Sequence, residues 1–148
     1  MKKHYPVLRS VVWGMCAYHL FLGCTLNGPG NWISTVLTHL LGATRIPDAS
    51  ALFAGRMLGV YLIVFGLGLG LAAWNPIKNR ALLSLGAILV VIRGIQRLVQ
   101  FQDLETALGI PASTNWTAVA ILWAFGVTLV FFRYRVFKEM RQSGLAAE

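Results

Sequence analysis

Hydrophobic residues are concentrated in four long blocks along the chain. The blocks cover about residues 8–26, 52–74, 81–102 and 116–133. As a helix, each is long enough to cross the roughly 30 Å hydrocarbon core of a bilayer. The pattern predicts an all-α fold, in which a single membrane domain over residues 1–148 forms a bundle of four transmembrane helices.

A shorter hydrophobic pattern follows the first block, after the chain-breaking sequence Asn27-Gly28-Pro29-Gly30. In the segment 31–42, apolar residues recur at helical spacing rather than alternating as in a strand. We therefore expect an amphipathic helix in the first outer loop, lying on the membrane surface or capping the bundle. A short strand is the less favoured alternative.

Basic residues identify the side of the membrane on which each loop lies. The chain has 13 Lys and Arg against 5 Asp and Glu, which gives a net charge of +8. Nine of the basic residues fall before residue 10, in the loop 75–80, or after residue 132. Such clustering at the ends of spans predicts that both termini are cytoplasmic and argues against a nucleic-acid-binding surface.

Three arginines lie inside the hydrophobic blocks. Arg93 and Arg97 are one helical turn apart in the third block and share a helical face with Gln100, and Arg56 lies near the outer end of the second block. His19 falls in the outer half of the first block. Because charged residues within spans normally face protein or a water-filled cavity, we expect these five side chains to converge on an outward-facing pocket.

Two explanations of the arginines stay open at the level of sequence. In the structural one, Arg97 reaches outward to pair with Glu105 or Asp103, and Arg56 reaches the outer headgroups. In the functional one, the absence of acidic residues within the blocks leaves the arginines to bind a ligand. Suitable ligands are a lipid phosphate, an organic carboxylate, an oxidised sulfur anion, or the carbonyl of a quinone or pigment.

Small residues line one face of the second block. Gly55, Gly59, Gly66 and Gly70 fall within about 60° of one another at 100° per residue. Such a face lets two helix backbones approach closely in lipid. It predicts packing against another helix of the same bundle or, less favoured, against another subunit.

The sequence contains no catalytic motif, metal-ligand cluster or phosphate-binding loop. Cys16 and Cys24 are eight residues apart, which separates them by roughly 12 Å along a helix. That distance excludes a mutual disulfide. We therefore expect no metal and no catalytic residues, with the reservation that either cysteine could serve as a redox centre.

The second and third blocks resemble those of the small four-helix bacterial membrane proteins called DoxX-like and BphX-like. The resemblance rests on Gly55-Arg56-x-x-Gly59, on Asn75-Pro76, and on an arginine in the third block. It implies a multi-pass protein of the bacterial inner membrane, with Arg56 and Arg93 as the matching positions. It also implies an accessory or quinone-linked component.

These observations favour a small accessory subunit of a larger membrane complex for respiratory or photosynthetic electron transfer. Such a subunit would contact other membrane protein subunits and membrane lipid, and would bind a lipid, quinone or pigment. One alternative is a quinone-linked oxidoreductase component that binds a small anion in the arginine pocket. A further alternative is a carrier of small anions or metabolites.

Overall fold

The computed structural model describes residues 5–29, 32–45 and 48–142. Within them the chain is entirely helical apart from its loops and turns, as the sequence predicts. The helices are α1 (Tyr5–Asn27), α2 (Trp32–Leu41), α3 (Ala49–Trp74), α4 (Arg80–Val99), α5 (Phe101–Leu108) and α6 (Ala112–Gln142).

Four of these helices are long and apolar enough to cross a membrane. The candidate spans are Tyr5–Asn27, Leu52–Trp74, Arg80–Val99 and Ala112–Glu139. This confirms the predicted bundle of four transmembrane helices. The sequence prediction placed the end of the fourth block too early, because α6 continues as a helix to Gln142. It also missed α5, which follows α4 after a bend at Gln100.

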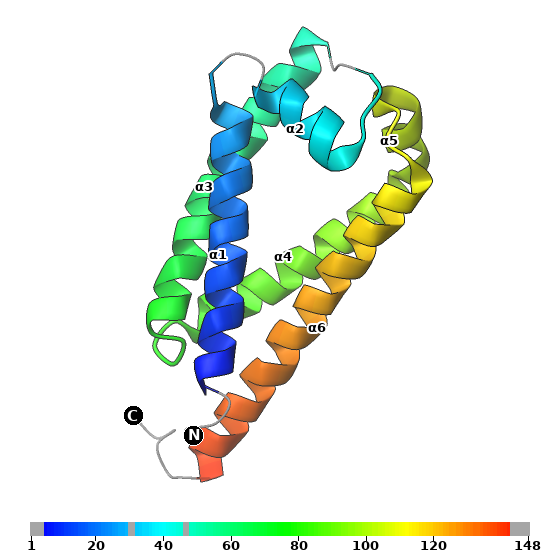
Figure 1. Cartoon of the computed structure of the whole chain (residues 1–148). Helices are drawn as coiled ribbons and strands as arrows, with labels where there is room; N and C mark the ends of the chain where they lie inside the picture. Colours follow the sequence, from blue (N-terminus) through cyan, green and yellow to red (C-terminus); the bar gives the residue numbers. More distant parts are fainter. Residues whose placement is uncertain (1–4, 30–31, 46–47, 143–148) are drawn as a thin grey trace.

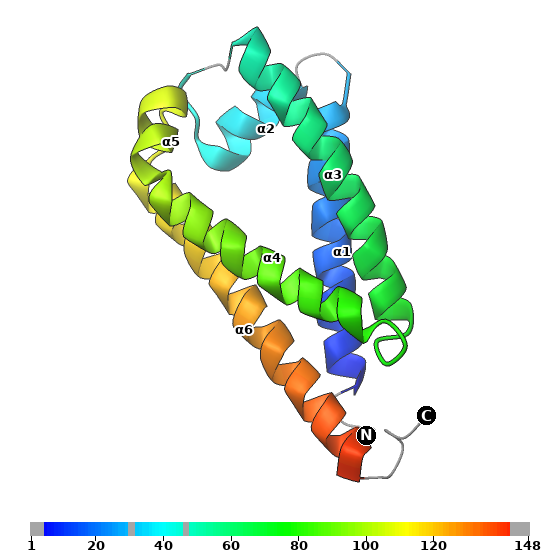
Figure 2. The same cartoon turned by 180° about the vertical axis from the view of Figure 1, so that it is seen from behind.

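The four spanning helices form two pairs, α1 with α3 and α4 with α6 (Figure 1). The pairs meet at the end of the molecule where α1 begins and α6 ends, which we call the narrow end. They diverge toward the other end, which we call the wide end, and the wedge between them is also evident from behind (Figure 2). The short turn between α3 and α4 joins these two helices at the narrow end, and they diverge from there (Figure 1).

The narrow end contains the hydrophobic core. Leu8, Leu69, Leu83 and Leu129, one from each spanning helix, are completely buried or nearly so, with at most 1% exposure. Arg9 donates a hydrogen bond of 2.9 Å from Nε to the carbonyl of Ala73 near the end of α3. This bond satisfies one of the carbonyls that a helix leaves unpaired at its C-terminus.

The glycine face of α3 packs against α1. A Cβ atom placed on Gly59 would lie 3.0 Å from the carbonyl oxygen of Gly23, and one on Gly66 would lie 3.0 Å from the side chain of Leu20. A Cβ on Gly70 would lie 3.3 Å from Cys16 Sγ, whereas one on Gly55 would meet nothing within 4 Å. Three of the four glycines therefore lie in the contact between α1 and α3, and Gly55 lies outside it.

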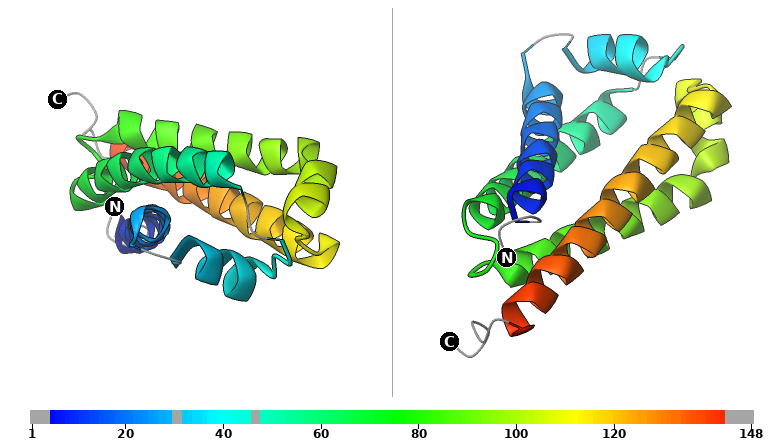
Figure 3. Two further views of the ribbon diagram at one scale, coloured as in Figure 1. Left: turned by 90° about the horizontal axis from the view of Figure 1, so that it is seen from above. Right: turned by 60° about the horizontal axis from the view of Figure 1, so that its bottom comes forward.

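Helix α2 crosses the wide end from the α1 side toward α5, as the view from above shows (Figure 3). Both α2 and α5 end at a left-handed glycine, Gly42 with φ 65° and Gly109 with φ 64°. Glycine is favoured there because it adopts this conformation without steric cost. Beyond α2, the backbone N–H groups of Thr44 and Arg45 both donate to the carbonyl of Leu108, so the two helix ends are joined.

Candidate functional site

A cavity of about 490 Å³ lies between the two helix pairs. Its walls come mainly from α1, α4 and α6. The short helices α2 and α5 and the helix α3 each contribute one leucine, namely Leu41, Leu104 and Leu58. The volume falls within the range typical of small-molecule binding sites.

The polar residues of the cavity are gathered toward the wide end. They are Tyr18, His19, Arg93, Gln96, Arg97, Gln100, Thr114 and Thr117. Toward the narrow end the lining becomes apolar, with Met15 on α1, Val90 on α4 and Phe125 on α6. The cavity therefore has a cationic, hydrogen-bonding end and a hydrocarbon end.

Arg97 is anchored at the polar end by a side chain of α6. Its Nε donates a hydrogen bond of 2.5 Å to Oδ1 of Asn115, which is 2% exposed. In the described part of the chain, Arg97 makes no ion pair with Asp103 or Glu105, both of which are exposed on α5. The outward pairing considered from the sequence is thus wrong, and the buried Nη2 of Arg97 has no hydrogen-bond partner among the described residues.

Arg93 lies one turn deeper than Arg97 and is only partly exposed. Its guanidinium forms no hydrogen bond or ion pair with any residue that the structure describes, and it lines the cavity. No acidic residue is present among the residues that line the cavity. Five N–H donors of an always-charged group are consequently available to a ligand.

His19 belongs to α1, and Arg93 and Arg97 lie opposite it on α4. Its side chain is 3% exposed. Its Nδ1 lies 2.7 Å from the carbonyl oxygen of Met15. Because a carbonyl only accepts hydrogen bonds, Nδ1 carries a proton and donates this bond. Edge contacts with Tyr18 and Phe65, at 5.3 and 5.0 Å between ring centroids, fix the imidazole.

The structure brings together four of the five predicted ligand-binding residues, His19, Arg93, Arg97 and Gln100. Arg56 is exposed and does not line the cavity. The prediction that it shares a pocket with the other four residues is therefore wrong. The residue of α3 that does line the cavity is Leu58. Two residues along a helix turn the side chain by about 200°, so Arg56 points nearly away from it.

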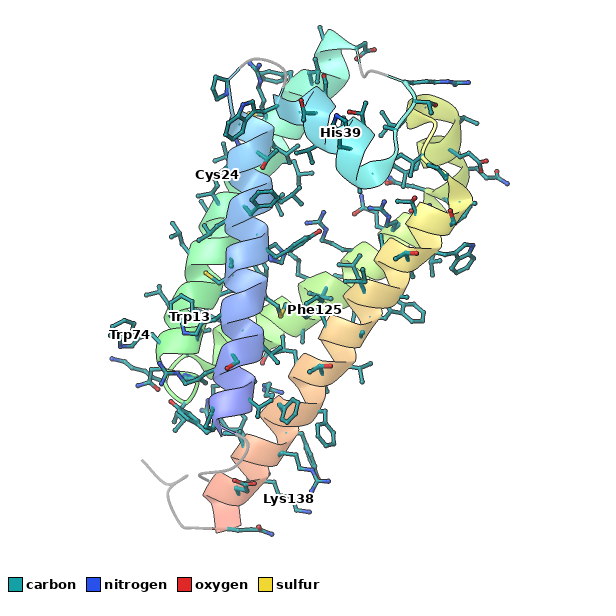
Figure 4. All side chains as sticks on the ribbon, in the orientation of Figure 1. Trp13, Cys24, His39, Trp74, Phe125 and Lys138 are labelled. Atoms are coloured by element: carbon teal, nitrogen blue, oxygen red, sulfur yellow. The ribbon has the colours of Figure 1, made fainter. Side chains whose placement is uncertain are left out.

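Sequence reasoning missed several residues of the site. Asn115 was recognisable as an amide near the start of the fourth block, at a depth where an antiparallel neighbour would carry Arg97. Tyr18 precedes His19 directly, but nothing in the sequence separated it from other interfacial aromatic residues. Helix α2 contributes Leu41 to the cavity, whereas His39 on the same helix is exposed and does not line it (Figure 4).

A second cavity of about 270 Å³ lies farther toward the narrow end, between α1 and α6. Its lining consists of Val11, Ile121, Ala124, Phe125 and Thr128. Ile121 and Phe125 also line the first cavity. The two cavities are therefore adjacent along the seam between α1 and α6.

Neither cysteine lines these cavities. Cys16 is buried against Gly70 of α3, and Cys24 is exposed. Among the described residues, no three His, Cys, Asp or Glu side chains are placed so that they could hold a metal ion. The chemistry that this site offers is thus anion binding and hydrogen bonding next to an apolar surface.

Comparison with protein-family models, curated proteins and solved structures finds no match to this chain.

Proposed function

We propose that this protein is a small, non-catalytic membrane component that binds a ligand with an anionic group or a strong carbonyl acceptor in the cavity between its helix pairs. The ligand classes that fit this chemistry are a lipid, a quinone or a pigment. The protein would present the ligand within a larger electron-transfer complex.

The observation that carries the proposal is the state of Arg93. A guanidinium within the hydrocarbon region costs at least about 2.5 kcal/mol on insertion scales. Here it faces a cavity without an acidic residue and makes no hydrogen bond to the described chain. A bound anion or carbonyl oxygen would offset this cost, because charge-assisted hydrogen bonds are strong in a low dielectric.

The proposed orientation puts both termini in the cytoplasm of a bacterium and the narrow end at the inner face of the plasma membrane. Basic residues at that end support it, among them Arg9, Lys78, Arg80 and Lys138. Lys138 lies near the end of α6 (Figure 4). The polar end of the cavity then lies in the outer leaflet, within reach of lipid headgroups and lipid-soluble cofactors.

Binding is better supported than passage of a solute or a thiol reaction. The completely buried leucines of the narrow end close the wedge below the cavities, which argues against a carrier path through the bundle. The cysteines lie outside both cavities, so a thiol-based electron transfer there has no support.

The association with other subunits remains a prediction. Most of the glycine face is used against α1, so a partner helix would contact other surfaces. Large apolar side chains are exposed on the outside of α3, for example Phe53, Tyr61 and Leu71, and these meet lipid or a partner. A relationship to the DoxX-like proteins is likewise a proposal, supported by the quoted motifs of α3 and α4 alone.

The proposal is tested by native mass spectrometry of the protein after gentle extraction from its own membrane. We expect the wild-type chain to carry a small-molecule adduct, which Arg93→Leu abolishes. Arg56→Leu is the matched control, because it removes an arginine of α3 that is exposed and outside the cavity.

The proposal fails if the wild type carries no adduct, or if the two variants retain it equally. Larger proteins that co-elute with the wild type would support the accessory role. A monodisperse single chain that carries an adduct would support the binding site but contradict the accessory role in a larger complex.

A further inference from the structure

We infer that the ligand is an anionic amphiphile taken from the membrane. Its headgroup lies at Arg93 and Arg97, and its hydrocarbon chain runs along the seam between α1 and α6 into the second cavity. This inference rests on the proposed function and specifies the ligand class and its direction in the site.

The adjacency of the two cavities is the first argument. Ile121 and Phe125 belong to the lining of both, so the two cavities adjoin and these two side chains lie between them. In Figure 4, Phe125 lies on the side of α6 that faces α1. A hydrocarbon chain that passes these two partly exposed side chains would reach the second cavity directly from the first.

The order of side chains along α6 is the second argument. Thr114 and Thr117 line the first cavity near the arginines, Ile121 and Phe125 lie at the junction, and Thr128 lies at the far end of the second cavity. From Thr114 to Thr128 the helix rises roughly 21 Å. One leaflet accounts for half of the hydrocarbon core, about 15 Å, so the path has room for a headgroup and a long chain.

The chemistry of the second cavity is the third argument. No charged residue lines it, and four of its five lining residues are apolar, namely Val11, Ile121, Ala124 and Phe125. A small free anion bound at Arg93 and Arg97 would leave this apolar space without a function. A hydrocarbon chain attached to the anion would fill it.

Access from the bilayer follows from the exposure of the seam. Tyr18 is 48% exposed, Ile121 51% and Phe125 39%, although all three line the first cavity. In a membrane, the exposed parts of these side chains face the acyl chains of the surrounding lipid. An amphiphile can therefore enter sideways between α1 and α6 without first leaving the bilayer.

The test measures binding of defined probes to the full-length chain in mild detergent by titration and native mass spectrometry. The probes are hexadecyl phosphate, octyl phosphate, inorganic phosphate and hexadecanol. We expect hexadecyl phosphate to bind most tightly, octyl phosphate more weakly, and the other two not measurably. Arg93→Leu should abolish the binding of both alkyl phosphates.

The chain-binding part is isolated by Ala124→Phe, which fills the second cavity. We expect this variant to lower the affinity for hexadecyl phosphate about tenfold, equivalent to about 1.4 kcal/mol, and to leave octyl phosphate unchanged. Ala120→Phe is the matched control on the same helix, because Ala120 is exposed and lines neither cavity. If Ala124→Phe does not fold, Thr128→Phe with Val127→Phe as its control makes the same comparison.

The outcomes separate the two proposals. Equal affinity for hexadecyl and octyl phosphate, with no effect of Ala124→Phe, overturns the amphiphile while the arginine site stands. Binding of inorganic phosphate alone also overturns it and indicates a soluble anion. Equal binding of hexadecanol overturns the role of the anionic headgroup. The absence of binding by every probe overturns the amphiphile, whereas the proposed binding of a ligand at Arg93 is overturned only if the native adduct is also absent.

Discussion

The contact between α1 and α3 and the space between the two helix pairs are built from different residues and do different things. In the contact, Gly23 and Gly59 bring the two backbones together, and Leu20 lies against Gly66. In the space between the pairs, Arg93, Gln96 and Arg97 of α4 and Gln100 at its C-terminal end line the cavity with polar side chains.

The difference shows which residues let two membrane helices pack closely and which leave a space between them. Helices in lipid gain little from hydrophobic burial against each other, so close packing of small residues holds them together. Long polar side chains prevent such packing and need hydrogen-bond partners in return. Arg97 obtains one from Asn115, whereas Arg93 has none among the described residues, which is why the open region is the candidate site.

The largest expected effect is at the closed contact. Gly59→Val should destabilise the folded chain by about 3 kcal/mol, because its Cβ would lie 2.9 Å from Leu26 Cβ and 3.0 Å from the carbonyl oxygen of Gly23. Thermal unfolding in detergent measures this. Gly55→Val is the control on the same helix, since its Cβ meets nothing within 4 Å, and equal destabilisation by both would contradict the glycine contact.

A smaller loss is expected at the anchored arginine. Arg97→Leu removes the partner of the buried Asn115 amide, and an unsatisfied buried polar group costs about 1–3 kcal/mol. The double variant Arg97→Leu with Asn115→Leu should recover part of this loss, because neither polar group then remains. Denaturation of both variants and the wild type gives the comparison. A double variant less stable than Arg97→Leu would show that the hydrogen bond is not the cause.

The smallest expected effect concerns the packing of α4 against α6. A Cβ on Gly94 would overlap the indole ring of Trp123, so Gly94→Ala should cost about 1 kcal/mol. Trp123 is 47% exposed and can move partly aside, which keeps the cost low. Gly126→Ala, whose nearest neighbour would be Val90 at 3.5 Å, should be neutral. Thermal unfolding that ranked these two variants in the opposite order would argue against this packing.

The amount of the fold that the sequence predicts depends on the range of the interactions involved. The four spans and the helix over 31–42 follow from local hydrophobic periodicity, and α2 is found at Trp32–Leu41. Helix α5 was missed because its eight residues include Gln102, Asp103, Glu105 and Thr106, a polar composition typical of a loop. The predicted fourth block ended at residue 133 because the basic residues that follow are typical of a polar C-terminal tail. In the structure they belong to α6, which continues to Gln142.

The candidate site was also predicted only in part, namely where the pattern within a single helix determines it. The face shared by Arg93, Arg97 and Gln100 is a property of one helix, so helical spacing alone indicates it. The addition of Arg56 rested on similar depth, and depth does not fix the direction in which a side chain points. Asn115 is eighteen residues from Arg97, and their contact exists only because α4 and α6 pack side by side.

By itself, the sequence determined that this chain is a bundle of four transmembrane helices, that α3 has a glycine face, and that α4 has a polar stripe. These features follow from hydrophobicity and the helical repeat, which act within one segment. Only the tertiary structure decided that α1 pairs with α3, that the pairs diverge into a wedge, and that two adjoining cavities lie between α1 and α6. Those outcomes depend on close contacts between segments distant in the chain, as between Gly23 and Gly59 or Gly94 and Trp123, and no local pattern specifies them.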